Sequence, residues 1–304
     1  MITRWTCGGV CTYIYISEGE WGMAVRLLID SASDFDLKEA TERNMLFVPL
    51  SINFGDDSYQ DGVTIEKNEF YEKLLNGKIY PKTAQPAPDL FLEHFKAAKE
   101  AGDELVAIVI SSGLSGTLQS ALIAKDMCDY DGIYVVDSLN CVTGLRLLID
   151  VAAKMRDDGA SAKEIVAEIE ELRHRVKIVA VVDTLEFLYK GGRLTKTAQL
   201  IGTLASLKPF VSLDENGKIY VLDKVIGRKK AYKNFFKILE KTPFDPAYPI
   251  NFLYFYEPEN GHILAKDVAE LYPGVDAKCV YPCGPTIGAH VGNNAYGFSY
   301  IVKK

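Results

Sequence analysis

The chain has 304 residues, of which 48% are hydrophobic and 25% are charged. This composition excludes a disordered or collagenous protein and allows one large domain or two ordinary ones, each with its own core. The formal net charge of −7 at pH 7 argues against nucleic acid as the main partner, although local cations and backbone amides can still bind an anion.

From Val25 onward, apolar runs alternate with segments that have a helical pattern. The runs are continuously apolar, which is typical of parallel strands buried on both faces of a sheet. The polar segment 55–62 is expected to be a turn, and the prolines of 82–88 predict a stiff loop. We expect strands at 25–30, 46–54, 104–110 and 132–137. We expect helices that end near Asn44, begin near Glu66, or span 89–101 and 117–128, and residues 138–155 predict a turn that leads into a long helix.

The pattern changes after a charged helix at 161–176. Residues 207–227 predict two strands joined by a Glu-Asn-Gly turn, which is an antiparallel hairpin. Helices at 228–241 and 261–271, a strand at 250–256 and a final β region follow. We therefore predict an α/β protein with two domains. Residues 23–180 form a domain with a parallel sheet flanked by helices, and residues 181–304 form a second α/β domain with a mainly antiparallel sheet.

Residues 1–22 lie outside this pattern, because Met23 is followed at once by the first strand-like run. Either Met23 is the natural start, or residues 1–22 are an appended arm. The first residues lack the basic-then-apolar order of a secretory signal, and no run of roughly 18 apolar residues occurs. The six cysteines are too sparse for a disulfide scaffold. We therefore expect a cytoplasmic protein without stable insertion in a membrane.

Loops that follow parallel strands converge at the carboxyl edge of the sheet, where open α/β folds bind ligands. Three such loops, 30–34, 111–117 and 137–140, are rich in Ser and Asn. In 111–117 two glycines allow tight turning and Thr117 begins a helix, so hydroxyls and exposed amides favour an anion. The alternative for each loop is simple helix capping. Three such loops on one edge favour a binding site.

Two further segments contribute candidates. The proline-stiffened loop 82–88 holds Thr83 and Gln85 at little cost in entropy, so these side chains can be aimed at a ligand; alternatively the loop is only a rigid connector. The glycine-dense segment 284–297 is expected to be β-like and contains His290. This histidine needs only hydrogen-bonding distance and an ordinary pKa to donate to a carboxylate.

Basic residues gather around two glycine-containing segments. Lys190, Arg193 and Lys196 surround a glycine pair, and Arg228 begins the run Arg-Lys-Lys at 228–230. In an acidic protein such clusters suggest a phosphate or an acidic partner surface. The alternative is a solvated basic face.

Enzymatic motifs are scarce. The sequence has no G-x-G-x-x-G, no Walker A and no H-E-x-x-H, so we expect no cofactor. Cysteine pairs 7/11 and 279/283 lack the usual zinc spacing, and we expect no metal. The stretch "GLSGT" nearly matches a nucleophile elbow, but Thr117 replaces the last glycine. A serine hydrolase that uses Ser115, Asp183 and His290 is the enzymatic alternative.

Six segments occur together, in an order that resembles the DegV family of bacterial fatty-acid-binding proteins. The resemblance covers residues 25–302. Departures from the family pattern are Ala84 and Ala87, where serines are usual, and Leu118, where an aromatic residue is common. The six segments are "IDSASD", "KTAQPAP", "ISSGLSGTLQSA", "VDTLEFLYKGGRL", "GRKKA" and "GPTIGAHVG".

The resemblance implies two α/β domains with one long-chain fatty acid in a tunnel between them. The protein would do no chemistry itself but would present the fatty acid to a separate fatty acid kinase, which phosphorylates the carboxylate for phospholipid synthesis. Matched by motif, Thr83 and Ser115 would hold the carboxylate with His290 nearby, and Ser112 is a further candidate. The residues implied to face the kinase are Arg193, Lys190 and Arg228.

The residues that line the tunnel cannot be identified from these motifs. We expect them in helix 89–101 and in the apolar segment 200–211, although both could be ordinary core. A different amphipathic carboxylate in the same tunnel remains an alternative to a fatty acid.

Overall fold

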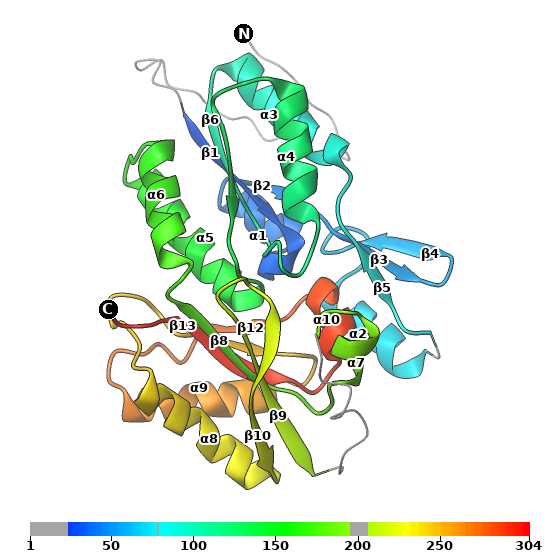
Figure 1. Cartoon of the computed structure of the whole chain (residues 1–304), viewed down its shortest axis with the longest axis vertical. Coiled ribbons are helices and arrows are strands. Elements are labelled where there is room, and N and C mark those ends of the chain that lie inside the picture. Colours follow the sequence, from blue (N-terminus) through cyan, green and yellow to red (C-terminus); the bar gives the residue numbers. More distant parts are fainter. Residues whose placement is uncertain (1–23, 78, 195–205) are drawn as a thin grey trace.

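The computed structural model describes residues 24–77, 79–194 and 206–304 (Figure 1). Residues 1–22, Met23, Lys196 and segment 200–205 lie outside the described residues, so the expectations placed on them stay predictions. The described chain contains a parallel sheet, a small antiparallel sheet and a larger, mainly antiparallel sheet.

The first sheet is parallel, as predicted, with the strand order β2-β1-β6-β7. Leu28 and Ala107 belong to the core beneath α3 and α4, whereas Leu27 and Val106 pack toward α5 and α6 (Figure 1). Helices on both faces explain why these strands are continuously apolar. The bounds are β1 Val25–Asp30, β2 Met45–Val48, β6 Glu104–Val109, β7 Ile133–Asp137, α3 Pro88–Ala101, α4 Thr117–Cys128, α5 Val142–Asp157 and α6 Ala162–Leu172.

A three-stranded antiparallel sheet, in the order β4-β3-β5, corrects two expectations. The predicted strand 46–54 is divided at Pro49, which has no N–H for a sheet, so its halves join different sheets. The predicted turn 55–62 contains an exposed edge strand, since Gly55 (φ +64°) turns the chain back early. The bounds are β3 Ser51–Phe54, β4 Asp57–Gln60, β5 Lys82–Ala84, η1 Ser31–Ser33, α1 Leu37–Glu42 and α2 Lys67–Asn76.

The second large sheet has the strand order β10-β9-β8-β13-β11-β12 and is antiparallel except for the pair β11 and β12. The predicted hairpin is confirmed, because β9 and β10 pair in antiparallel register. The domain boundary that we predicted between residues 180 and 181 falls inside β8 of this sheet. The bounds are β8 Val176–Val181, β9 Leu207–Leu213, β10 Ile219–Ile226, β11 Asn251–Tyr254, β12 Val280–Pro282, β13 Tyr296–Ile301, α7 Glu186–Lys190, α8 Arg228–Lys241 and α9 Glu259–Leu271.

The two faces of this sheet pack against different partners. Val179 and Phe298 contact the core beneath α8 and α9, whereas Ile178, Ala180 and Val211 face the opposite way and join the core that contains α5 (Figure 1). Side chains alternate between faces along a strand, so adjacent residues serve separate cores. The core on the α5 side therefore contains residues from both large sheets.

Segment 284–297, expected to be β-like, instead contains helix α10, Pro285–Val291. The carboxylate of Asp34 accepts the N–H of Gly284, and that of Asp61 accepts the N–H of Thr286. These carboxylates stabilise the helix start, where backbone N–H groups lack partners within the helix. They are 250 and 225 residues away along the chain, so a local glycine-rich pattern could not predict this helix.

Candidate functional site

A narrow cavity between the two large sheets brings together residues from distant segments. Its volume is about 30 Å³. Most of its wall is apolar and comes from the loops that follow β2, β6 and β7, from α10 and from β10. Its polar lining residues are Thr83, Ser115, Arg193, Thr286 and His290. Three of the four residues predicted to hold a carboxylate, Thr83, Ser115 and His290, therefore line one cavity.

His290 and Thr83 are in direct contact. His290 Nε2 lies 2.8 Å from Thr83 Oγ1, which joins α10 to β5. Nδ1 of His290 is buried and has no hydrogen-bond partner among the described residues. Burial, reinforced by the charge of Arg193, lowers the pKa of His290 to about 4. The expectation of an ordinary pKa was wrong, and the imidazole is neutral at pH 7.

The backbone of Gly191 lies directly over the imidazole of His290. A Cβ at this glycine would be 2.0 Å from Nδ1 of His290. Gly191 thus lets the end of α7 approach α10 closely. The geometry explains why a glycine is needed at this position.

The turn 111–117 is held to the β5 loop by Gln85. The Gln85 amide donates to Ser120 Oγ at 2.9 Å, and its side chain lies so close to Gly116 that a Cβ there would overlap it. Ser115 Oγ is 2.8 Å from Thr117 Oγ1. Of the two alternatives for this loop, a ligand contact or a rigid connector, Gln85 fits the second, because it positions the turn that carries Ser115 beside the strand that carries Thr83.

Arg193 lies in the cavity wall, although the sequence suggested a surface role. Its Nε donates to the carbonyl of Leu114 at 3.1 Å and its Nη1 to that of Gly191 at 2.6 Å. The guanidinium is half-buried and close enough to lower the pKa of His290. Arg193 therefore supplies positive charge beside the polar lining of this cavity.

The two serines at the start of the turn have different roles. Ser112 is exposed and donates to Asp137 Oδ2, so the structure does not place it with Thr83 and Ser115. Ser111 is buried, and its Oγ donates to the carbonyl of Gly217 in the β9–β10 turn. Ser111 thereby links the turn of the first sheet to the second sheet.

Behind the cavity lie three fully buried carboxyl groups. Asp61 accepts from both the N–H and the Oγ1 of Thr286, which lines the cavity. Burial raises the pKa of Asp61 to about 6 and that of Asp30 to about 7, and it also raises the pKa of Asp34. The sequence analysis missed Thr286. Its position two residues after a glycine in "GPTIG" gives no sign of the carboxylate that orients it.

A second small cavity, of about 40 Å³, continues the first along the inner face of the second sheet. The two share Cys141, Ile219, Ile287 and Val291. Its other lining residues are almost all apolar and come mainly from β8, β9 and β11, with Val142 from α5 and Phe255 just after β11. Val211 lies in the predicted tunnel segment 200–211, whereas helix 89–101 packs in a separate core, in line with the alternative that its apolar face is ordinary core. Together the cavities form a path with a polar end and an apolar end.

The remaining candidates lie elsewhere. Lys190 pairs with Glu186, and its ammonium lies 3.8 Å from the centre of the Tyr80 ring. Arg228 lines a different cavity, as does Asp183, which pairs with Lys208. The three residues of the alternative hydrolase triad therefore bond to other partners: Ser115 to Thr117, His290 to Thr83, and Asp183 to Lys208.

Neither a metal cluster nor a membrane-spanning helix is found in the part of the chain that the structure describes. Within residues 24–77, 79–194 and 206–304, no group of three or more His, Cys, Asp or Glu side chains could hold a metal ion. None of the described helices is long and apolar enough to cross a membrane.

Residues 24–303 match the family model described as "Uncharacterised protein, DegV family". The chain belongs to the DegV family. A DegV domain-containing protein of Caldanaerobacter subterraneus subsp. tengcongensis is 36% identical over 291 residues, which are 92% of this chain and 99% of that protein. The predicted family and the predicted α/β fold are thus both confirmed.

Solved structures of DegV proteins resemble the whole described fold. A fatty-acid-binding DegV family protein from Thermus thermophilus has a TM-score of 0.83 and 30% identity, covering 92% of this chain and all of the other. A stearic acid-binding protein from Eubacterium ventriosum has a TM-score of 0.80 and 28% identity, with 92% and 98% coverage. Both of these structural neighbours are described as fatty-acid-binding proteins.

Proposed function

We propose that this protein binds one long-chain fatty acid, with the carboxylate at Thr83, Ser115 and His290 and the tail along the apolar cavity. The observation that carries the proposal is the cavity in which the contact between Thr83 and His290 lies beside Ser115 and Arg193. The fatty acids bound by the relatives named above support it.

The polar end suits a carboxylate. Hydroxyls and one neutral imidazole can donate to its oxygens, and Arg193 offsets its charge. Each charge-assisted hydrogen bond contributes about 1.5–3 kcal/mol. Thr286 also lines this end, but its hydroxyl donates its one hydrogen to Asp61, so it is not counted among these donors. Ser112 is left out because its hydroxyl is exposed and bonded to Asp137.

The apolar end suits a hydrocarbon tail. Burying each methylene contributes roughly 0.8 kcal/mol, so a C16–C18 tail supplies most of the affinity. The two cavities, of about 30 and 40 Å³, are smaller than the roughly 300–1,000 Å³ typical of ligand pockets. Binding therefore requires the walls formed by α5, α10 and the second sheet to move apart.

We propose a carrier role, in which a separate fatty acid kinase phosphorylates the bound carboxylate. Lys190 is exposed next to Gly191, which covers His290, so a kinase that docks at the end of α7 would approach the carboxylate. Arg193 lies close to this end of α7, in the wall of the cavity that contains Thr83 and His290. Arg228 lines another cavity, so it would contact the kinase only if the interface with the kinase extended from α7 to that cavity. The four described cysteines are free thiols, which fits a reducing cytoplasm.

The test is to purify the protein, denature it, extract it into organic solvent and measure the extract by mass spectrometry. We expect a stoichiometric C14–C18 fatty acid, and its loss from a variant with Thr83→Ala and Ser115→Ala. An empty extract, even after incubation with excess fatty acid, would contradict the proposal. Labelling of Ser115 by a fluorophosphonate probe would instead support the hydrolase alternative.

A further inference from the structure

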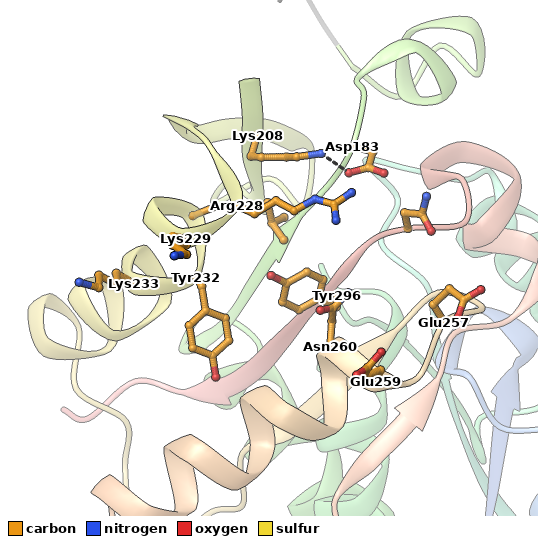
Figure 2. Close-up of a pocket in the computed structure, with 13 residues that line it drawn as sticks. Asp183, Lys208, Arg228, Lys229, Tyr232, Lys233, Glu257, Glu259, Asn260 and Tyr296 are labelled. Carbon is orange, nitrogen blue, oxygen red and sulfur yellow. Dashed lines mark hydrogen bonds and ion pairs between the residues drawn. The ribbon is translucent and has the colours of Figure 1, made fainter. Parts of the chain in front are cut away.

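A larger cavity lies in the second half of the chain, away from the proposed lipid site. Its volume is about 570 Å³, and it shares no lining residue with the cavity of Thr83 and His290. It is bounded by the ends of β8 and β13 and by the first turns of α8 and α9 (Figure 2). This volume is within the range of about 300–1,000 Å³ typical of small-molecule sites.

One wall of this cavity is cationic. Arg228, Lys229 and Lys233 all come from α8, and none forms an ion pair with another residue that the structure describes. Figure 2 shows the guanidinium of Arg228 reaching into the middle of the cavity, between the Lys208–Asp183 pair and Tyr296. An unpaired guanidinium in a cavity is suited to a planar or tetrahedral oxyanion.

The start of α8 adds to the positive potential of that wall. Arg228 is the first residue of the helix, Gly227 is its N-cap, and no side chain caps it. The N–H groups of the first turn therefore lack partners within the helix. Together with Arg228 and Lys229 they favour a doubly charged anion such as a phosphate.

The opposite wall is acidic and rich in amides. Glu257 and Glu259 line it without an ion pair to any described residue, and Asn260 and Asn294 lie beside them. In Figure 2, Glu257, Glu259 and Asn260 lie across the cavity from Lys229. Carboxylates accept hydrogen bonds from hydroxyl or amino groups. A ligand that meets both walls must therefore be anionic at one end and rich in donors at the other.

We propose that this cavity binds a small phosphate ester that also carries hydroxyl or amino groups, as nucleotides and polyol phosphates do. The phosphate contacts Arg228 and Lys229, and the donor groups face Glu257 and Glu259. The ring of Tyr296 forms part of the surface between the two walls. The proposal is independent of fatty acid binding, because the two cavities have no lining residue in common.

The experiment is calorimetric titration of the full-length protein with four probes: AMP, glycerol 3-phosphate, inorganic phosphate and adenosine. We expect both esters to bind more tightly than inorganic phosphate, and adenosine not to bind. The double variant Arg228→Ala with Lys229→Ala should lower the affinity for both esters by about tenfold or more. The double variant Glu257→Gln with Glu259→Gln should lower the affinity for the esters but not the affinity for inorganic phosphate.

The matched control is Lys237→Ala with Lys241→Ala. Both lysines are exposed on α8 but do not line the cavity, so affinity for the esters should be unchanged. An equal loss in this control would show only general attraction to a basic helix and would overturn the proposal. Absence of ester binding at millimolar concentration, or equal affinity for inorganic phosphate and both esters, would also overturn it. Thermal unfolding of each variant verifies that it is folded.

Discussion

His290 Nε2 and Thr83 Oγ1, 207 residues apart in the chain, lie 2.8 Å from each other. The contact joins α10 to the small β4-β3-β5 sheet at the polar end of the cavity. Because His290 is neutral at pH 7, one ring nitrogen donates and the other accepts, so the pair can present a donor to a carboxylate.

Replacement of Thr83 by Val keeps the side-chain shape and removes the hydroxyl. We expect the affinity for a C16–C18 fatty acid to fall by roughly 5- to 150-fold, because a donor to the carboxylate and the partner of His290 are lost together. Displacement of a fluorescent fatty acid measures this change. Thr41→Val, at an exposed site on α1, is the control. Equal affinities for the wild type and Thr83→Val would remove Thr83 from the site.

Gly191→Ala places a methyl group against Nδ1 of His290 and should displace the imidazole. We expect weaker fatty acid binding, measured by the same displacement assay. The neighbour Gly192 provides a matched comparison, since its φ is +72° and a Cβ there would touch nothing within 4 Å. Gly192→Ala should cost about 1–2 kcal/mol of stability through backbone strain while leaving binding intact. The reverse pattern would contradict the proposed role of His290.

The adjacent serines at 111 and 112 should behave differently. Ser111→Ala leaves the carbonyl of Gly217 and the N–H of Gly113 without their buried partner, so the free energy of unfolding should fall by about 1–3 kcal/mol. Ser112→Ala, at an exposed site, should change it by less than about 0.5 kcal/mol. Urea unfolding of both variants measures the difference. If Ser112→Ala alone greatly lowered the affinity for a fatty acid, Ser112 would belong to the carboxylate site.

The buried Asp30 predicts a dependence of stability on pH. Its folded pKa of about 7 is above its unfolded value of 3.8, so the folded state binds more protons between these values. The contribution of Asp30 to the free energy of unfolding is fully present below pH 3.8 and is lost as the pH rises to 7. His290 acts in the opposite direction, since its lowered pKa of about 4 makes stability fall as the pH drops from 6.5.

The two contributions can be separated by mutation. Asp30→Asn should reduce the loss of stability between pH 4 and 7, and His290→Gln should reduce the loss on acidification below pH 6.5. Urea unfolding from pH 4 to 8 gives the slope of the free energy of unfolding against pH for the wild type and both variants. If Asp30→Asn had the same slope as the wild type, Asp30 would not titrate in this range.

Local patterns predicted most of the fold. Continuous apolar runs identified the parallel sheet, and the Glu-Asn-Gly turn identified the β9–β10 hairpin, because both depend on nearby residues. Helix α10 escaped prediction, since Asp34 and Asp61 stabilise its start from the other end of the sequence. The small sheet was also missed, because its edge strand β4 is short, polar and exposed.

The candidate site was only partly predictable for the same reason. Thr83, Ser115 and His290 were found through motifs that resemble the DegV family, and the structure places them around one cavity. Which serine of the turn faces inward depends on its contact with Gly217, and the direction of Arg193 depends on the carbonyl of Leu114. Neither contact can be predicted from a periodic pattern in the sequence.

Strand β13 pairs with β8 on one side and with β11 on the other, which places residues 296–301 in the interior of the second sheet. A nascent chain that still lacks these residues has β8 and β11 without their shared neighbour. The sheet can close only after residues 296–301 have left the ribosome. A truncation just before β13 should therefore expose two strand edges and favour aggregation over a folded, partly active protein.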